Sequence, residues 1–392
     1  MSRKDRLSGN EAVANAIRQI DPDVIAVFPI TPSTEIPQFV SSFKAAGQIT
    51  TEFVAVESEH SAISACVGAE AAGVRAMTAT SSAGFALMHE MLYVAASDRL
   101  PVVMAVVNRA LTGPININND HSDSMGSRDS GWLQLYSENA QEAYDNMLMA
   151  HRIAEDPRVR LPLMVCMDGF ITSHAVENIV LEDDETAKNF VGEYKPEQYL
   201  LNPAQPVAYG PYGISNYYME MKKAQTVAME NALEVIREVS KAYGDVTGRQ
   251  YDLIENYRME DAEYAVICIG SSAGTGKDAV DTLRAQGKKV GLIKIRSFRP
   301  VPSADIAKAL AHVKAVAILD KTDSFSAAGG PLGAEVRAAM YHAGLQAKAL
   351  NLIYGLGGRD VKVNDFYSVF EKLAAMDGGE AIPMFDYIGV RE

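Results

Sequence analysis

The sequence predicts an α/β protein: a doubly wound, mostly parallel sheet followed by a second, smaller α/β domain. Three observations predict this fold. Strand-like and helix-like segments alternate up to about residue 170 and again from about residue 262. The strand-like segments are almost entirely apolar, which is typical of parallel strands that helices cover on both faces. Between the two alternating blocks, residues 180–255 break the pattern.

The first block opens with a short amphipathic helix that follows Ser8-Gly9-Asn10, and strands and helices then alternate. The helix SEHSAISACVGAEAAG is rich in small residues, and the strand PVVMAVVNRAL is the most apolar of the set. The predicted strands are 23–28, 51–56, 75–82, 101–111 and 161–170, and the predicted helices are 11–20, 58–73, 85–97 and 138–156.

The interruption contains LNPAQPVAYGPYG (201–213), which is rich in Pro, Gly and Tyr and is predicted to be irregular. A long helix is predicted over 221–243, with Gly244 as its end. We place the domain boundary after it, giving domains of 1–255 and 256–392. The second block is predicted to contain strands at 262–270, 289–295, 314–320 and 349–354, and helices at 277–286, 303–313 and 333–343.

Composition excludes several classes of protein. The chain has 392 residues, enough for two or three domains, and a formal net charge of −14. That charge argues against a nucleic-acid-binding surface, which needs a basic face. The first residues lack the continuous apolar core of a signal peptide, and the longest apolar stretches are too short to cross a bilayer. We therefore expect a cytoplasmic protein with neither nucleic acid nor membrane as a partner.

The chain has three cysteines, Cys66, Cys166 and Cys268, and no CxxC motif. Cysteines so far apart do not form a zinc or iron–sulfur site by themselves. All three lie in apolar contexts, so we expect buried, inert thiols.

Unusual corners follow four of the predicted strands. They are FPITPST (28–34), VESEHSA (56–62), TATSSAG (78–84) and the long segment 107–125. Parallel sheets deliver ligands to the carboxyl ends of their strands, so these corners are expected to line one crevice. In the first corner two prolines flank Thr31, and proline stops a strand because it has no N–H to donate.

Three charged residues at these corners are candidates for function, and each has an alternative explanation. Glu57 and Glu59 begin a helix, where an acid gains about 0.3–1 kcal/mol from the helix dipole whether or not it has a function. The functional alternative is a carboxylate that hydrogen-bonds a heterocyclic cofactor. Arg109 ends the most apolar strand. It is either an ordinary arginine at a strand end or a guanidinium that captures a small carboxylate.

Two other motifs suggest sites that we do not favour. DHSD (120–123) resembles a metal site, but such residues in a loop are more often solvated polar groups. GSSAGTGKD (270–278) resembles a phosphate-binding loop. However, Ser271 stands where a glycine is required, and Asp278 stands where a serine or threonine is required. We predict a tight turn there, with Thr275 near the helix cap.

Seven segments taken together resemble the α chain of the 2-oxoacid:ferredoxin oxidoreductases, especially the pyruvate enzymes. They occur in family order and span nearly the whole chain, so the set is far more specific than any one segment. They are FPITPST, VESEHSAISACVGAEAAG, TSSAGFALMHEM, the segment 107–145, DGFITSH, GRQYDLIENYRMEDAEY and YGLGGRD.

The resemblance implies a thiamine diphosphate enzyme divided among several chains. This chain is similar to the pyrimidine-binding domain, a doubly wound parallel sheet, followed by a transketolase C-terminal-like domain. By position, Glu59 would hydrogen-bond the aminopyrimidine ring of thiamine diphosphate. Arg109 and Thr31, with Ile30 beside them, would hold the carboxylate of the oxoacid. The activity implied is oxidative decarboxylation of pyruvate with coenzyme A, electrons passing to ferredoxin.

The resemblance also implies partners. No GDG motif with a following Asn pair is present to hold Mg²⁺ and the diphosphate, and no cluster-binding cysteines are present. The implied partners are a β subunit with the diphosphate and Mg²⁺ site, a ferredoxin-like iron–sulfur subunit, a γ-type subunit and ferredoxin itself. Two positions depart from the family pattern and bear on substrate choice: Phe28 stands where many relatives have tyrosine, and Ala83 where glutamine is common.

Three alternatives stay open. The same chemistry could act on a branched-chain, aryl or other 2-oxoacid. The chain could be a non-catalytic scaffold subunit, against which Glu59, Arg109 and Thr31 argue. It could also belong to a thiamine-dependent decarboxylase without electron transfer.

Overall fold

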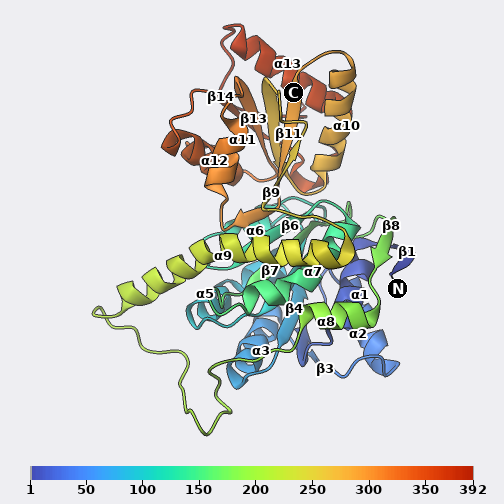
Figure 1. Cartoon of the computed structure of the whole chain (residues 1–392), viewed down its shortest axis with the longest axis vertical. Coiled ribbons are helices and arrows are strands. Elements are labelled where there is room, and N and C mark those ends of the chain that lie inside the picture. Colours follow the sequence, from blue (N-terminus) through green and yellow to red (C-terminus); the bar gives the residue numbers. More distant parts are fainter. Residues whose placement is uncertain (1, 392) are drawn as a thin grey trace.

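The computed structural model describes residues 2–391 and resolves helices and strands in alternation along most of the chain (Figure 1). Up to residue 247 the elements are β1 (Arg3–Leu7), α1 (Gly9–Ile20), β2 (Val24–Val27), α2 (Glu35–Ala45), β3 (Glu52–Ala55), α3 (Glu59–Ala72), β4 (Ala76–Thr80), α4 (Ser82–Leu87), α5 (His89–Ser97), β5 (Val103–Asn108), α6 (Ser122–Gly126), β6 (Leu133–Ser137), α7 (Ala140–Ala154), β7 (Leu163–Asp168), β8 (Glu177–Leu181), α8 (Asp184–Val191) and α9 (Tyr218–Thr247). The remainder are β9 (Ile254–Tyr257), β10 (Tyr264–Ile269), α10 (Ser272–Ala285), β11 (Val290–Ile295), β12 (Ser297–Arg299), α11 (Ser303–Leu310), β13 (Ala315–Asp320), α12 (Pro331–His342), β14 (Lys348–Ile353), a short 3₁₀ turn (Leu356–Gly358), α13 (Val363–Asp377) and β15 (Phe385–Tyr387).

These elements form two α/β parts, each built around its own sheet (Figure 1). The first sheet has seven strands in the order β12-β6-β7-β5-β4-β2-β3, and the second has six in the order β15-β14-β13-β10-β11-β9. Neighbouring strands are parallel, except that β12 runs antiparallel to β6 and β9 antiparallel to β11. The predicted α/β class with doubly wound parallel sheets is confirmed.

Local sequence explains several helix ends. The Ser8 hydroxyl accepts a hydrogen bond from the Glu11 amide, and the Glu11 carboxylate accepts one from the Ser8 amide, so α1 begins with a capping box. Helix α3 ends at Gly73, whose φ of 104° suits glycine. The prediction that α9 ends at Gly244 is wrong. The helix continues to Thr247 and stops at the left-handed Gly248, because tertiary packing of its buried face outweighs one glycine in its interior.

The sequence patterns missed elements whose partners lie far away along the chain. Strands β1 and β8 form a separate antiparallel pair, although their residues are about 175 apart in sequence. Strand β6 was hidden inside the long segment 107–145, and α8 inside an acidic stretch that suggested irregular structure. Each of these elements is held by contacts with segments far away in the sequence, so its own residues give a weak signal.

The two parts are joined by shared structure. Strand β12 leaves the second part and pairs with β6 in the first sheet. A buried ammonium lies at the junction: Lys294 Nζ is 2.9 Å from Glu138, 3.0 Å from Glu142 and 2.9 Å from Glu255. The boundary that we place between residues 255 and 256 falls inside β9, which pairs with β11 of the second sheet.

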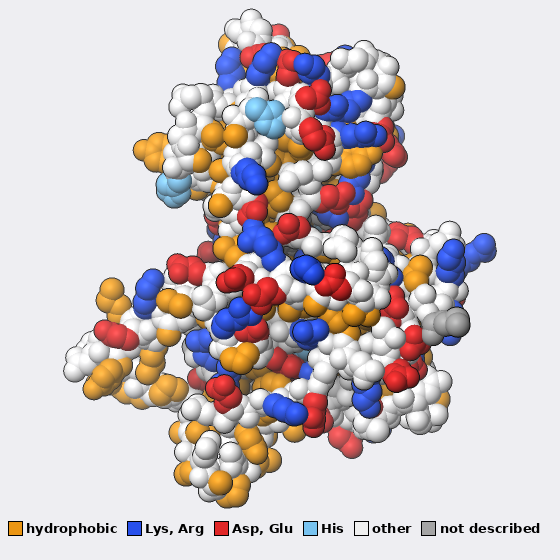
Figure 2. Space-filling view, in the orientation of Figure 1, with side chains coloured by type: hydrophobic (Ala, Val, Ile, Leu, Met, Phe, Trp, Pro, Cys, Tyr) orange, Lys and Arg blue, Asp and Glu red, His pale blue; other side chains and the backbone are white. Residues whose placement is uncertain are grey.

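Residues 193–217 form an arm that first packs against the end of α3, where the Leu200 amide donates to the Ala71 carbonyl at 2.8 Å, and then loops away from the body before α9 begins (Figure 1). Its apolar side chains, with those of the first turn of α9, gather on the outer surface (Figure 2). Leu201 is 72% exposed, Tyr212 93% and Met219 78%. Exposed apolar side chains gathered in this way are typical of a surface that another molecule covers. Among the described residues, no helix has the length and hydropathy needed to span a bilayer.

Candidate functional site

The order of strands in the first sheet creates a crevice at its carboxyl edge. From β2 the chain goes to β3 on one side and then returns to β4 on the other side of β2. The loops after β2 and β4 therefore leave in opposite directions, and ligands bind α/β sheets at such a point. The predicted corners 28–34, 56–62 and 78–84 lie at this switch.

The corner after β2 is held rigidly. Ser33 donates to the carbonyl of Ile30 through both its amide, at 2.9 Å, and its hydroxyl, at 2.8 Å. Asn10 of α1 donates from Nδ2 to the Pro32 carbonyl at 2.9 Å. These bonds fix the backbone while the Thr31 side chain is left exposed at the crevice.

Arg109 is brought to this corner from the end of β5. It is only 7% exposed. Its Nη1 donates to the Thr31 carbonyl at 2.9 Å, and its Nε donates to the Asn116 carbonyl at 3.0 Å. Within residues 2–391 its Nη2 has no hydrogen-bond partner. The structure thus places Arg109 and Thr31 side by side, with one guanidinium nitrogen free to bind an anion.

The two acids of the next corner have different surroundings. Glu57 is exposed and accepts a hydrogen bond of 2.7 Å from the Ser61 hydroxyl. Glu59, the first residue of α3, is 6% exposed, and no partner for its carboxylate is found in the described part of the chain. The cap of α3 is Ser58, whose hydroxyl accepts from the Ser61 amide at 3.2 Å. The helix therefore does not require Glu59 as its cap.

Gly84 of α4 lies against the Glu59 carboxylate. A β-carbon at position 84 would come within 2.4 Å of Glu59 Oε1, closer than any real contact. The corner TSSAG after β4 thus provides the space that Glu59 occupies. A buried carboxylate without a partner, at the switch point of a parallel sheet, fits the aminopyrimidine of thiamine diphosphate, which needs a carboxylate to hydrogen-bond a ring nitrogen.

The prediction that DHSD is a solvated loop is wrong. Asp120, His121 and Asp123 are all buried. Asp120 accepts from the Gly357 amide in the second part at 3.2 Å, and His121 Nε2 lies 2.7 Å from Asp168 Oδ1. These residues form internal hydrogen bonds because the segment lies beneath the second part. No group of three or more His, Cys, Asp or Glu that could hold a metal ion occurs within residues 2–391.

Asp168, at the end of β7, is a buried residue that sequence reasoning missed. Its carboxylate accepts hydrogen bonds from Lys321 Nζ at 2.5 Å and from the Ser271 hydroxyl at 2.5 Å. Both donors belong to the second part. Burial alone would raise its pKa, but Lys321 and His121 outweigh burial, so its pKa lies well below the ordinary value. An aspartate that ends an otherwise apolar strand was the available signal.

The segment GSSAGTGKD forms the start of α10, and the predicted place of Thr275 is wrong. Helix α10 begins at Ser272, so Thr275 lies inside its first turn. Ser271 stands at the cap position, and its hydroxyl binds Asp168. The three cysteines are buried, as predicted, and burial raises the pKa of the Cys66 thiol to about 12.

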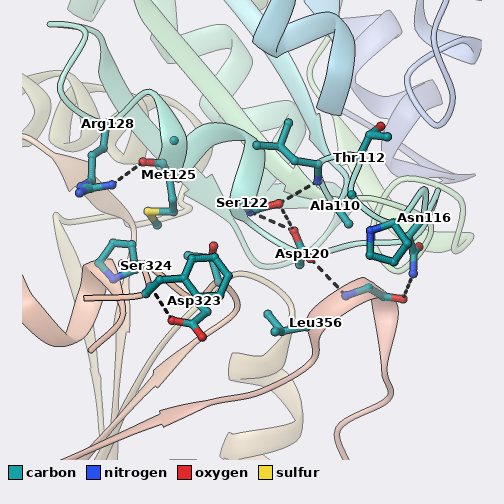
Figure 3. A pocket seen from close by; sticks show the side chains of 18 residues that line it. Ala110, Thr112, Asn116, Asp120, Ser122, Met125, Arg128, Asp323, Ser324 and Leu356 are labelled. Carbon is teal, nitrogen blue, oxygen red and sulfur yellow. Dashed lines mark hydrogen bonds between the residues drawn. The ribbon is translucent and has the colours of Figure 1, made fainter. Parts of the chain in front are cut away.

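A cavity of about 620 Å³ lies beside the predicted site, between the two parts (Figure 3). The segment 110–128 lines one wall, and residues 322–325 with Leu356 and Gly357 line the other. Asn116 and Asp120 cross to Gly357, as the dashed lines of Figure 3 show. Glu59, Thr31 and Arg109 do not line this cavity, although Arg109 immediately precedes its wall.

Family models match most of the chain. The model described as pyruvate flavodoxin/ferredoxin oxidoreductase, thiamine diphosphate-binding, matches residues 15–241. The model described as pyruvate:ferredoxin oxidoreductase core domain II matches residues 262–366.

The chain is also similar to curated proteins over nearly its full length. It is 50% identical to pyruvate synthase subunit PorA of Thermotoga maritima, over 98% of this chain and 98% of that protein. It is 42% identical to the subunit of the same name from Methanocaldococcus jannaschii, again over 98% of each. It is 41% identical to ketoisovalerate oxidoreductase subunit VorA of Pyrococcus horikoshii, over 94% of this chain and 93% of that one.

Solved structures share the fold. A 2-oxoglutarate:ferredoxin oxidoreductase from Magnetococcus marinus superposes with a TM-score of 0.75 at 19% identity, covering 94% of this chain and 65% of that chain. A split-gene transketolase superposes with a TM-score of 0.57 at 10% identity, covering 95% of this chain and all of that one. At these identities the likeness concerns the fold alone.

Proposed function

The chain belongs to the pyruvate:ferredoxin oxidoreductase family, and we propose that it is the α subunit of a multi-chain pyruvate:ferredoxin oxidoreductase. The observation that carries this is full-length identity of 50% to a pyruvate synthase subunit, together with a buried, unpartnered Glu59 at the sheet's switch point. The reaction converts pyruvate and coenzyme A to acetyl-CoA, CO₂ and a proton. Two electrons pass to ferredoxin, and the reaction can run in either direction.

We propose these roles for the residues of the site. The Arg109 guanidinium binds the oxoacid carboxylate, aided by Thr31 and Ile30 at the rigid corner. Two bonds to backbone carbonyls already orient the guanidinium, so little side-chain freedom is lost when the anion binds. Glu59 hydrogen-bonds the aminopyrimidine ring and holds a proton there. When bound, thiamine diphosphate supplies the carbon nucleophile and takes up the electron pair released as CO₂ leaves.

We propose that other chains complete the enzyme. A β subunit would hold Mg²⁺ and the diphosphate, a ferredoxin-like subunit the iron–sulfur clusters, and a γ-type subunit would join them in the cytoplasm. The exposed apolar arm 193–217 supports an assembly, because surface of this kind is covered in a complex. Within the chain, we propose a division near residue 255 into a pyrimidine-binding domain (1–255) and a transketolase C-terminal-like domain (256–392).

The test is to tag this chain, purify the native complex and assay it. Pyruvate with coenzyme A should reduce a low-potential acceptor, whereas the pure single chain should carry no iron. 2-Oxoisovalerate tests the branched-chain alternative, which the 41% identical ketoisovalerate subunit raises. A higher kcat/KM for that substrate would replace pyruvate in the proposal. Release of CO₂ without acceptor reduction would indicate a simple decarboxylase, and activity untouched by Glu59→Gln would indicate a scaffold subunit.

A further inference from the structure

Asp123 connects the ends of two neighbouring strands. Its side chain is 2% exposed. Its Oδ2 accepts from the amide of Ser82, which follows β4, at 3.0 Å and from the amide of Arg109, which follows β5, at 2.9 Å. One carboxylate oxygen therefore links the corner after β4, whose Gly84 packs against Glu59, to the corner after β5, where Arg109 lies.

The other oxygen is held equally firmly. Asp123 Oδ1 accepts from Asn108 Nδ2 at 2.8 Å and from the Ser124 amide at 2.7 Å. Four donors to a buried carboxylate leave it no freedom to move. Each oxygen needs to be an acceptor, because both of its hydrogen-bond partners are N–H donors. An asparagine side chain would therefore turn its NH₂ group toward two N–H donors.

The Ser82 corner is a strained one. Ser82 has a φ of 44°, a left-handed conformation that is unfavourable for a non-glycine residue. Its amide donates to Asp123, and its hydroxyl donates to the Ala110 carbonyl at 2.5 Å. The first bond ties the start of α4 to α6, and the second ties it to the segment just after β5. Two residues later, Gly84 packs against Glu59, so the position of Glu59 depends on the same bonds.

We propose that Asp123 is a positioning residue that holds Arg109 in register with the Gly84–Glu59 contact, and so sets the place of the oxoacid carboxylate relative to the cofactor. The inference rests on the proposed function. In this arrangement Asp123 touches neither the oxoacid nor the cofactor, so it is not a catalytic residue. The competing explanation is a buried carboxylate that only stabilises the fold.

The second part of the chain offers a matched control in Asp320. It is also 2% exposed and accepts from the Leu332 amide at 2.8 Å, the Gly333 amide at 2.9 Å and Asn351 Nδ2 at 2.8 Å. Burial raises the pKa of Asp123 and of Asp320 alike, each to about 6. Asp320→Asn thus imposes the same chemical change on a carboxylate that does not contact Ser82 or Arg109.

The experiment compares Asp123→Asn and Asp320→Asn in the assembled complex, by steady-state kinetics and thermal unfolding. Both variants should lower the unfolding temperature. Asp123→Asn should raise the KM for pyruvate about 10-fold or more and also lower kcat, on the scale of a lost buried charge-assisted hydrogen bond. Asp320→Asn should leave the pyruvate KM within about 2-fold of wild type, because Asp320 contacts no residue that we propose to bind the substrate.

If the wild-type complex is active and the two variants have equal pyruvate KM values, the inference is overturned but the proposed function is not. A wild-type complex that does not turn over pyruvate would overturn both. If Asp123→Asn does not assemble, Asn108→Ala provides the test, because it removes one donor to Asp123 and keeps both bonds to Ser82 and Arg109. An increase of about 3-fold in pyruvate KM supports the inference, and no increase overturns it.

Discussion

Arg109 Nη1 donates a hydrogen bond of 2.9 Å to the backbone carbonyl of Thr31, which lies 78 residues earlier in the chain. This bond joins the corner after β2 to the end of β5, across the β4 strand that separates them in the sheet. It orients the guanidinium toward the crevice before any ligand arrives.

Arg109→Ala should lower kcat/KM for pyruvate by about 30- to 1000-fold, because a charge-assisted bond to a buried guanidinium contributes about 2–4 kcal/mol. Arg109→Lys should recover only part, since an ammonium lacks the planar fork. Thr31→Val is the milder comparison and should cost about 1–2 kcal/mol, because it removes one neutral donor and keeps the carbonyl that Arg109 binds. Steady-state kinetics with pyruvate measures these changes, and a thiamine diphosphate titration of the same variants measures cofactor binding. Loss of cofactor retention with an unaltered pyruvate KM would make Arg109 purely structural.

Glu59→Gln should lower kcat by about 10²-fold or more while the complex still assembles, because an amide cannot hold the proton that the carboxylate does. Glu57→Gln is the matched control. It lies two residues away at the same helix end but is exposed, so its kcat should stay near that of wild type. Similar kcat values for both variants would show that Glu59 serves only the helix terminus.

Gly84→Ala should displace the Glu59 carboxylate, because the added β-carbon would lie 2.4 Å from Glu59 Oε1. We expect weaker thiamine diphosphate binding and a kcat lowered at least about 10-fold, measured by cofactor titration and turnover. Gly68→Ala, in the middle of α3, meets nothing within 4 Å. It should leave both quantities unchanged and stabilise the helix by about 1 kcal/mol. The idea fails if the two alanine variants behave alike.

Glu70 predicts a specific pH dependence of stability. Burial raises its pKa to about 8 in the folded chain, while the Ala76 amide donates to it at 2.8 Å. Between about pH 4.5 and pH 8 the unfolded chain has released this proton and the folded chain retains it, so the free energy of unfolding falls as pH rises through that window. The loss should be on the order of a few kcal/mol.

Glu70→Gln should flatten this dependence and keep the bond to Ala76, because the amide oxygen still accepts. Denaturant titrations at pH 6 and pH 9 provide the check, with the exposed Glu52→Gln as control. An unchanged slope of stability against pH in Glu70→Gln would mean that Glu70 ionises normally in the folded chain.

Asp168→Asn should destabilise the chain by about 3–5 kcal/mol, because it leaves the Lys321 ammonium buried without its countercharge. Lys321→Met should cost a similar amount by leaving Asp168 charged. The double variant should lose clearly less than the sum of the two, since neither charge is then left alone. Calorimetry of the assembled enzyme measures all three. Additive losses would show that the pair is not coupled.

The sequence by itself determined the fold class and the places where function is expected. Apolar runs such as 101–111 predict buried parallel strands because residues next to one another in the chain decide that periodicity. The corners at Thr31, Glu59 and Arg109 could be located because prolines, acids and a cation interrupt those runs. Features that depend on residues adjacent in the chain, such as a buried strand and the corner that ends it, could be predicted without coordinates.

Only the tertiary structure decided which buried polar groups meet. Nothing near Asp123 or Asp168 in sequence names Ser82 or Lys321 as partner, yet each aspartate is buried and fully hydrogen-bonded. The same holds for β12. The chain leaves the second sheet after β11, and its next strand, β12, pairs with β6 in the first sheet. The physical reason is that a buried charge is tolerable only when opposite groups surround it, and those groups come from segments that the folded topology, not the local sequence, places together.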